Sequence, residues 1–352
     1  MQIDQLTFLR FVAASGVVIF HFGRRVKSLE WADSLWSRAN TAVSFFFLLS
    51  GFILAHVYGQ AGVRRRADFY VARVARIVPL YWLALVAVTL YRWRKGTLNA
   101  YEFAASALLV QAWLPGWSQV LNGPGWSLSV EVLFYLCFPF LLGRIAGLGS
   151  PTLVVLASTL WATNLAAHIV LSHVCATGGH PQLQDFAAYS PPMHLATFVF
   201  GLVLGLLFEQ QRERIRPFAG LMMLIAVVVF LALILIPNSI VKYHHNGLFA
   251  PIFGLFVVGL ASAPHLQISR IFSRRPFVLL GEASYGIYIL QVPLYLGYAP
   301  VAQRLSMSPG FHFWSYYAAL VLASLASFQW IERPARKRIR SYYQSRLQKH
   351  PV

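Results

Sequence analysis

Long apolar runs recur along the whole chain, and they restrict it to one class of fold. The hydrocarbon core of a bilayer is about 30 Å thick and needs roughly 20 apolar residues of α-helix to cross it. Here 58% of the residues are hydrophobic and only 11% are charged. Because backbone groups in lipid must be hydrogen-bonded within the chain, such runs fold as helices. The sequence therefore predicts an all-α, polytopic integral membrane bundle, with eleven apolar segments at 6–22, 42–58, 77–91, 101–114, 128–142, 151–171, 193–208, 218–236, 248–263, 283–302 and 312–331.

The first apolar run and the two cysteines limit how the chain can be organised. No small-residue cleavage site follows the first run, which contains Arg10, so we expect a retained helix rather than a signal peptide. Cys137 and Cys175 provide neither a disulfide framework nor a metal-ligand spacing, and we expect no metal site. No internal repeat is visible. We expect a membrane domain over residues 1–335 and a basic cytoplasmic tail over residues 336–352.

The net charge of +18 is concentrated in a few loops. Cytoplasmic loops of membrane proteins carry an excess of Lys and Arg, so this charge indicates topology rather than nucleic-acid binding. We expect both termini to be cytoplasmic, together with the basic loops that include residues 64–66 with Arg73 and Arg76, residues 212–216, residues 270–275 and the final segment RPARKRIRSYYQSRLQK.

Cytoplasmic termini require an even number of crossings, so one of the eleven segments cannot span. We expect about ten crossings and a re-entrant segment between residues 92 and 127, formed by the short run at 101–114 or by LPGWSQVLNGPGW after it. Irregular backbone at membrane depth is tolerated only against protein or a water-filled cavity, which makes this region a candidate neighbour of a site. One loop disagrees with the topology, because it would lie outside although it is basic: it contains Arg24, Arg25, Lys27 and Arg38.

The first apolar segment, LRFVAASGVVIFHF, carries Arg10 and His21. Eleven residues apart, they lie within about 20° of one helix face and roughly 16 Å apart along its axis. Ionisable residues within a membrane usually face a bundle interior or an aqueous cavity, where they mark pathways or chemistry. The alternative is that Arg10 snorkels to the inner interface while His21 sits at the outer one.

An acidic residue lies in the apolar run WSLSVEVLFYLCFP. Glu131 is flanked by Trp126, Ser127 and Tyr135, and Tyr135 is one helical turn away on the same face. A buried carboxylate is stable only when it is paired or hydrogen-bonded, and His21 or Arg10 could supply that partner from another helix. Glu131 could equally be a structural clamp between helices.

Arg73 and Arg76 stand at i and i+3 just before another apolar run begins. Guanidinium groups bind phosphate oxygens in bidentate fashion, so this pair suits a phosphate-bearing ligand at the cytoplasmic mouth of a bundle. The alternative is that cytoplasmic topology alone accounts for these arginines.

Together these features resemble the acyltransferase-three family of integral membrane acyltransferases, over nearly the whole chain. The most recognisable feature is an arginine, ten residues and a histidine in the first helix, here Arg10 and His21. Five further motifs follow in order along the chain. They are FFFLLSGFIL around Ser50 and Gly51, FYVARVARIVPLYW with Arg73, Arg76, Pro79 and Tyr81, WSLSVEVLFYLCFP with Glu131, SYGIYILQVPL with Tyr285, and IERPARK with Glu332 and Pro334.

The resemblance implies an O-acyltransferase of the cytoplasmic membrane that moves an acyl group, usually acetyl, from cytoplasmic acyl-CoA to a hydroxyl of a saccharide or related acceptor. His21 would act as general base or as acylated nucleophile, with an imidazole pKa near 6.5 in water suiting the first role. No permanently bound cofactor is expected. The residues assigned in this way are His21, Glu131 and Arg10 for catalysis; Arg73, Arg76, Arg10 and Tyr81 for the donor; and Trp126, Ser127 and Tyr285 for the acceptor.

Two departures and two rival functions stay open at this point. Many relatives have histidine where this chain has Gln291, so a second imidazole is missing, and the hydrolase-like domain that some relatives carry after the last helix is not seen. A proton-coupled transporter would also use membrane Arg, His and Glu, although such folds often show repeats. A non-catalytic lipid-binding scaffold would need only basic loops and aromatic belts, without His21 and Glu131 in apolar runs.

Overall fold

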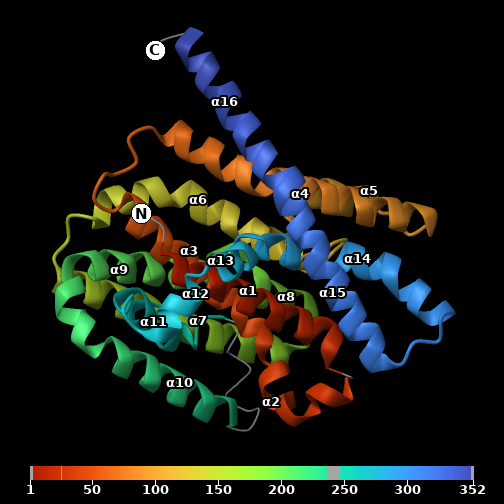
Figure 1. Ribbon diagram of the computed structural model, residues 1–352, viewed down its shortest axis with the longest axis horizontal. Coiled ribbons are helices and arrows are strands. Elements are labelled where there is room, and N and C mark those ends of the chain that lie inside the picture. Colours follow the sequence, from red (N-terminus) through yellow and green to blue (C-terminus); the bar gives the residue numbers. More distant parts are fainter. Residues whose placement is uncertain (1–2, 25, 236–245, 350–352) are drawn as a thin grey trace.

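The computed structural model describes residues 3–24, 26–235 and 246–349, which form helices and turns with no strand among them (Figure 1). The all-α prediction is confirmed for this part of the chain. The helices are α1 (Asp4–Val18), α2 (Asp33–Trp36), α3 (Ala42–Tyr58), α4 (Arg66–Arg94), α5 (Ala100–Ala107), α6 (Trp126–Ile145), α7 (Ser150–Gly178), α8 (Pro181–Tyr189), α9 (Pro191–Ile215), α10 (Ala219–Leu235), α11 (Ala250–Ser262), α12 (Gln267–Phe272), α13 (Arg275–Glu282), α14 (Ser284–Arg304), α15 (Pro309–Ser327) and α16 (Arg333–Lys349).

Seven helical stretches are long and apolar enough to cross a membrane, and the bent pair α13 and α14 makes an eighth. One of the seven, Pro181–Leu235, contains both α9 and α10, which are joined by the 3-10 turn Arg216–Phe218. Counting α9 and α10 separately and including the short apolar helix α11 gives ten apolar helices in the described part of the chain. This agrees with the predicted polytopic bundle, since every predicted apolar segment except 101–114 falls on one of the ten.

The run at 101–114 does not form a spanning helix. It folds as the short helix α5, a left-handed turn at Leu109 with φ 57°, and the 3-10 turn Gln111–Trp113. Two of its carbonyl groups accept hydrogen bonds from buried hydroxyl groups: Tyr81 Oη donates to the Ser106 carbonyl at 2.6 Å, and Ser129 Oγ donates to the Leu109 carbonyl at 2.6 Å. Protein partners thus replace the helical hydrogen bonds that this irregular backbone lacks.

Helices α3 and α9 form the most extensive helix pair in the bundle. Small residues let two backbones approach closely where no hydrophobic driving force acts between helices. A Cβ atom added at Gly51 would collide with the Phe198 carbonyl oxygen, and one added at Gly201 would collide with the backbone of Leu48. The glycine of the motif FFFLLSGFIL therefore serves helix packing.

Helix α1 lies inside the bundle and contacts α3, α11, α12, α13 and α14 (Figure 1). Its contact with α13 is a close backbone approach, because a Cβ atom at Gly281 would collide with the Thr7 carbonyl oxygen. After Val18 the helix widens into one π-helical turn, Ile19–Gly23, which contains His21. Such turns occur frequently at functional sites.

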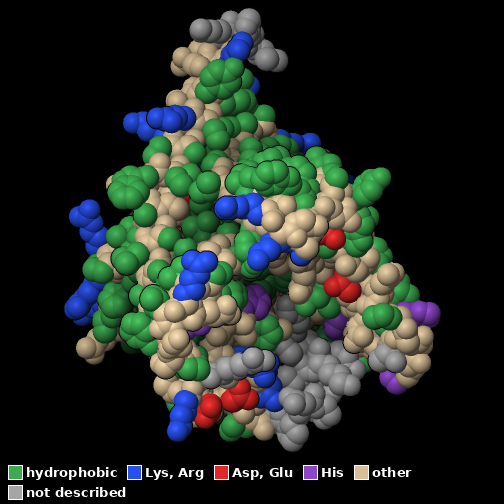
Figure 2. Space-filling view, turned by 90° about the vertical axis from the view of Figure 1, so that its right-hand side faces the viewer, with side chains coloured by type: hydrophobic (Ala, Val, Ile, Leu, Met, Phe, Trp, Pro, Cys, Tyr) green, Lys and Arg blue, Asp and Glu red, His purple; other side chains and the backbone are tan. Residues whose placement is uncertain are grey.

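The C-terminal helix α16 projects from the body of the molecule (Figure 1). Its first part packs against α4, and the rest is strongly basic; Figure 2 shows basic side chains along this projection. The domain boundary predicted at residue 335 falls inside this helix. The first turns of the helix belong to the bundle, because Arg336 lines a cavity described below. The basic tail is therefore a continuation of the fold rather than a separate extension.

Candidate active site

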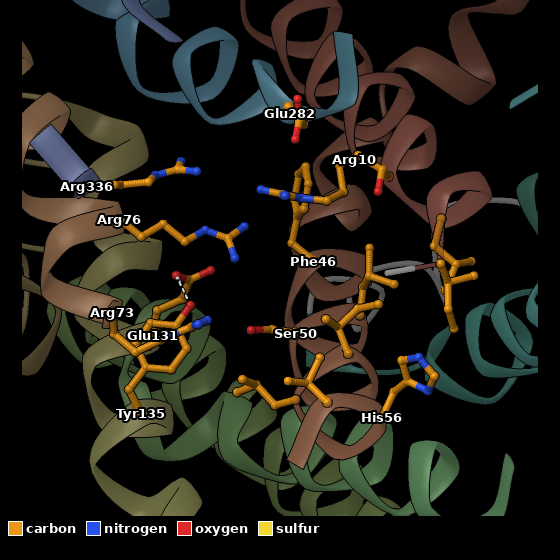
Figure 3. Close-up of a pocket in the computed structure, with 17 residues that line it drawn as sticks. Arg10, Phe46, Ser50, His56, Arg73, Arg76, Glu131, Tyr135, Glu282 and Arg336 are labelled. Atoms are coloured by element: carbon orange, nitrogen blue, oxygen red, sulfur yellow. Dashed lines mark hydrogen bonds between the residues drawn. The ribbon is translucent and has the colours of Figure 1, made fainter. Parts of the chain in front are cut away.

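A polar cavity of about 390 Å³ opens between α1, α3, α4, α6, α13 and α16. Four guanidinium groups line it, and Figure 3 shows three of them, from Arg10, Arg76 and Arg336, directed toward a common space. The carboxylates of Glu131 and Glu282 line it as well, so the arginines leave an excess of positive charge. A cavity with this lining attracts an anionic ligand. We call it the inner cavity.

Three separate helices bring these four arginines together. Arg10 comes from α1, Arg336 from α16, and Arg73 and Arg76 from successive turns of α4, where their i, i+3 spacing places them on one face. Three of the four, Arg10, Arg73 and Arg76, were predicted from the sequence as site residues. Arg336 was assigned to the tail, because nothing in the sequence indicates that α16 returns to the cavity.

The four arginines differ in how far they are already engaged. Arg336 donates to Glu332 at 2.7 Å, and Glu332 is only 1% exposed. The guanidinium of Arg73 lies 5.7 Å from the centre of the Tyr135 ring. Neither Arg10 nor Arg76 makes a hydrogen bond or ion pair within the described residues. Their donors are the ones available to a ligand.

Glu131 is hydrogen-bonded within its own helix. Tyr135 Oη donates to Glu131 Oε2 at 2.9 Å, one turn along α6, and the Ser50 hydroxyl faces this pair across the cavity (Figure 3). Glu131 and Arg10 also line a smaller cavity of about 50 Å³, which continues from the inner cavity toward Ser127, Tyr285 and Tyr288. Beyond Arg10, the smaller cavity is lined by α3, α6 and α14.

His21 lies at the other end of α1, in an outer pocket of about 560 Å³ lined by Phe20, His21, Phe22, Arg24 and Tyr295. This placement agrees with the axial separation of Arg10 and His21 that was expected from helix geometry. The outer pocket combines one imidazole with three aromatic rings and one guanidinium. Such a lining suits a saccharide, which offers apolar ring faces and hydroxyl groups.

The ring orientation of His21 is set by Gln291 on α14. Gln291 Nε2 donates to the Tyr288 carbonyl at 2.6 Å, which directs Gln291 Oε1 toward His21 Nδ1 at 2.8 Å. An amide oxygen only accepts, so Nδ1 must carry the hydrogen and Nε2 keeps its lone pair. Tyr316 Oη also donates to the Gln291 carbonyl at 2.7 Å. The imidazole is thus held in the tautomer that leaves Nε2 as a base.

The structure brings some predicted site residues together and separates others. Arg10, Arg73, Arg76 and Glu131 share the inner cavity, whereas His21 lies in the outer pocket. The partner of the imidazole is Gln291, so the predicted orientation of His21 by Glu131 is not observed. The residue noted as a departure from relatives is the one that contacts His21.

Two predicted ligand-binding residues have packing roles instead. Tyr81 is 1% exposed and does not line the inner cavity; its hydroxyl holds the irregular segment after α5, as described above. Trp126 is 4% exposed and packs edge-on against Phe47 and Tyr189. The sequence could not distinguish these roles for Tyr81 and Trp126, because large aromatic residues occur both in protein cores and in binding pockets. Ser127 and Tyr285 do line the smaller cavity, where Tyr285 Oη donates to the Ile77 carbonyl at 2.8 Å.

His56 is a further cavity residue, which has no acidic neighbour in the sequence and was not predicted as a site residue. It lines the inner cavity, and its Nδ1 lies 2.6 Å from Glu209 Oε1 on α9. The partner is 153 residues away in sequence, so only the packing of α3 on α9 reveals the pair.

Comparison with known proteins identifies relatives along nearly the whole chain. The sequence model of a family described as Acyltransferase domain matches residues 3–333. The chain is 22% identical to peptidoglycan O-acetyltransferase OatA of Listeria monocytogenes, over 94% of this chain and 55% of that protein. It is 29% identical to acyltransferase MdmB of Streptomyces mycarofaciens, over 59% of this chain and 58% of that protein. The chain thus spans little more than half the length of these relatives, and no solved structure matches it.

Proposed function

The chain belongs to the acyltransferase family whose domain it matches over residues 3–333, and from this membership we propose that it is a membrane O-acyltransferase. In this proposal it moves an acetyl group from cytoplasmic acetyl-CoA to a saccharide hydroxyl. The observation that carries the proposal is that the two ends of α1 have different linings. An arginine-lined cavity surrounds Arg10 at one end, and His21 with a defined free nitrogen lies at the other.

The inner cavity supports a role in binding the donor. Coenzyme A carries several phosphate groups, and guanidinium groups bind phosphate in bidentate, charge-assisted fashion. Arg10 and Arg76 are the cavity arginines without a protein partner among the described residues, so they are assigned to the donor's phosphates, with Arg73 beside them. The smaller cavity, which Arg10 and Glu131 also line, reaches Tyr288, whose carbonyl accepts from the Gln291 amide that contacts His21, and it suits the thioester arm of the donor.

The outer pocket supports the chemical step. Nε2 of His21 takes the proton from an acceptor hydroxyl as its oxygen attacks the thioester carbonyl carbon. The carbon–sulfur bond then breaks, and the coenzyme A thiolate receives the proton back from the imidazolium. A covalent acyl-imidazole formed at the same nitrogen is the alternative route, and Gln291 would orient the ring in both.

The acceptor is proposed to be a sugar hydroxyl of the cell envelope, reached from the face opposite the donor. One relative is a peptidoglycan O-acetyltransferase, and this likeness supports a glycan acceptor. The aromatic rings of Phe20, Phe22 and Tyr295 around His21 support it as well, since they can pack on sugar faces. Mass spectrometry of envelope glycans from cells with and without the protein would identify the sugar that loses its acetyl group.

The decisive test is His21→Ala. In membranes supplied with acetyl-labelled acetyl-CoA, we expect this variant to lose transfer to glycan by on the order of 10²- to 10⁴-fold, the range that a general base contributes. Binding of acetyl-CoA should persist, because the imidazole lies in the outer pocket and not among the arginines. His265→Ala is the matched control, since His265 lines neither cavity. Transfer at a normal rate by a correctly inserted His21→Ala protein would refute the mechanism.

A further inference from the structure

The smaller cavity is a narrow continuation of the inner cavity. The two cavities share Arg10, Phe46 and Glu131 in their linings, so they adjoin one another. A cavity needs about 10–15 Å³ to hold one water molecule, and the smaller cavity of about 50 Å³ therefore holds roughly four groups of that size. The end of an acetyl thioester matches this size, because it consists of a methyl group, a carbonyl carbon, an oxygen and a sulfur.

Helices α3, α6 and α14 line the smaller cavity in two layers, which are one helical turn apart, about 5.4 Å. The inner layer, beside Arg10, consists of Phe46, Glu131 and Ser284, and the outer layer consists of Val43, Leu128 and Tyr288. Along α3 and α6 the inner cavity is lined by residues further toward the C-terminal ends, such as Ser50 and Tyr135. The outer layer is thus the part of the smaller cavity that lies furthest from the inner cavity.

The outer layer lies toward His21. The π-helical turn Ile19–Gly23, which contains His21, contacts the 3-10 turn Ala39–Thr41, and that turn ends two residues before Val43. The carbonyl of Tyr288 accepts from the Gln291 amide that contacts His21. Two separate helices, α3 and α14, thus connect the outer layer to the imidazole. A donor that enters from the inner cavity would place its acyl group in this layer.

The two layers differ in chemistry. Arg10 and Glu131 give the inner layer charged groups, which suit the polar amide groups of the donor's arm. The outer layer is largely apolar, because Val43, Leu128 and the neighbouring Phe47 are all buried hydrophobic residues. Burial of a methyl group in apolar surroundings is favourable. The outer layer therefore suits the hydrocarbon end of an acyl group.

Neighbouring groups hold the walls of the outer layer in place. Phe47 packs edge-on against Phe134 and Trp126, with ring centres 5.1 and 5.8 Å away. Ser127, which also lines the smaller cavity, donates through Oγ to the Pro124 carbonyl at 3.0 Å. Protein interiors are close-packed, and extra methylene groups in such a site force side chains out of their preferred positions. The smaller cavity therefore resists a longer acyl chain.

Resting on the proposed function, we propose that the smaller cavity is the acyl pocket of the enzyme and that Val43 and Leu128 restrict the donor to acetyl-CoA. The methyl group of the acetyl lies between these two side chains, and the thioester lies between them and Arg10. Butyryl-CoA has two further methylene groups, so its chain meets the outer layer before its thioester reaches that position. The reaction is the transfer described above, and the acyl pocket determines which acyl group takes part in it.

The first test compares acetyl-CoA with butyryl-CoA as donors, in membranes whose own envelope glycans serve as acceptor. Wild type should have a kcat/KM about 10- to 100-fold higher for acetyl-CoA, which is the penalty expected from overpacking. Leu128→Ala removes carbon atoms from the outer layer and should shift the ratio of the two kcat/KM values about tenfold toward butyryl-CoA, as should Val43→Ala.

Leu142→Ala is the matched control, because Leu142 is a buried residue of the same helix, α6, and lines neither cavity. It should leave the ratio of the two kcat/KM values unchanged. Equal use of both donors by wild type would overturn the proposal. An unchanged ratio in both Leu128→Ala and Val43→Ala would overturn it as well.

A labelling experiment locates the acyl group without requiring transfer. Cys137 and Cys175 are replaced by alanine, and a single cysteine is introduced by Leu128→Cys or by Ser50→Cys, since Ser50 lines the inner cavity but not the smaller one. The probe is chloroacetyl-CoA, whose chloride is displaced by a cysteine thiolate as a carbon–sulfur bond forms. Leu128→Cys should be labelled more strongly than Ser50→Cys, and acetyl-CoA should block the labelling.

This measurement separates the acyl pocket from the proposed function. Labelling of Ser50→Cys that equals or exceeds that of Leu128→Cys would refute the acyl pocket, even in an active enzyme. Stronger, acetyl-CoA-sensitive labelling of Leu128→Cys, together with no acetyl transfer by wild type, would instead refute the proposed function alone.

Discussion

At the scale of single residues, the pair His21 and Gln291 links the observed geometry to the proposed chemistry. Neutral imidazole exists as two tautomers, and only the one with a free Nε2 can take a proton from a group in the outer pocket. Gln291 selects this tautomer because its amide is itself fixed by the Tyr288 carbonyl. Unlike a carboxylate, the amide is neutral, so it orients the ring without stabilising an imidazolium by charge.

We predict that Gln291→Leu lowers the acetyl transfer rate by about 10- to 100-fold, because the ring loses its orientation while the base itself remains. KM for acetyl-CoA should not change, since Gln291 lies away from the inner cavity. Steady-state kinetics on both substrates measures this split. Gln291→His, which places a ring nitrogen near His21 Nδ1 in place of the amide oxygen, should recover activity. A Gln291→Leu enzyme with the wild-type rate would show that the tautomer is fixed by something else.

Arg76 provides the corresponding test of the inner cavity. We expect Arg76→Ala to raise KM for acetyl-CoA by about 10- to 100-fold, the equivalent of one lost hydrogen bond to a charged group at roughly 1.5–3 kcal/mol. The turnover number should fall little, because a phosphate contact stabilises ground and transition states alike. Arg64→Ala is the matched control, since Arg64 is exposed and does not line the cavity. Equal effects of the two substitutions on KM would mean that Arg76 does not bind the donor and contributes only to the orientation of the protein in the membrane.

At the scale of elements, the bundle depends on the close approach of α3 and α9. We predict that Gly201→Ala destabilises the protein by about 1–3 kcal/mol, the usual cost of overpacking, because the added Cβ would meet the backbone of Leu48 and not a movable side chain. The lowered melting temperature can be measured in detergent. In Gly143→Ala the new Cβ has no neighbour within 4 Å, so this variant should melt at the wild-type temperature or slightly above it.

The sequence predicted the positions of the helices far better than it predicted which side chains of different helices contact one another. The segment 42–58 matches α3 (Ala42–Tyr58), and only the length of 101–114 distinguished the run that does not span. These features are local, because an apolar run of sufficient length must become a helix in lipid. Contacts between helices are not local: Gln291 lies 270 positions from His21, and no periodicity encodes their pairing.

The same limit explains the errors at the site. Arg10 and Glu131 were predicted to be functional because charge is costly in an apolar run, and both line the inner cavity. The cost of a charge does not identify its partner, so the sequence left His21 or Arg10 as candidates for Glu131, whereas the hydrogen bond of Glu131 is to Tyr135 and Arg10 shares its cavity. Tyr81 carries no charge, so this reasoning does not apply to it. Nothing in the sequence distinguishes a tyrosine that packs in the core from one that binds a ligand.

At the scale of the whole molecule, the two ends of α1 are chemically different. The inner cavity lies where α1 begins, where α3 ends and where α16 begins, and basic segments adjoin these last two ends. The outer pocket lies where α1 ends, next to the loop before α2. Because Lys and Arg concentrate on the cytoplasmic side, the inner cavity is assigned to the side where acetyl-CoA is made.

We therefore predict that residue 61 and residue 341 are cytoplasmic and that residue 30 is outside. Single cysteines at Ala61, Ser341 and Glu30, all exposed positions, can be introduced after Cys137 and Cys175 are replaced by alanine. In right-side-out vesicles a membrane-impermeant maleimide should label Glu30→Cys at once. It should label Ala61→Cys and Ser341→Cys only after the vesicles are opened, because the basic segments beside both positions are retained inside. Labelling of Ala61→Cys in sealed vesicles would invert the topology, and it would place the arginines on the side without donor and His21 on the cytoplasmic side. A cytoplasmic donor would then have to enter the outer pocket, whose lining holds one arginine, Arg24, against four in the inner cavity.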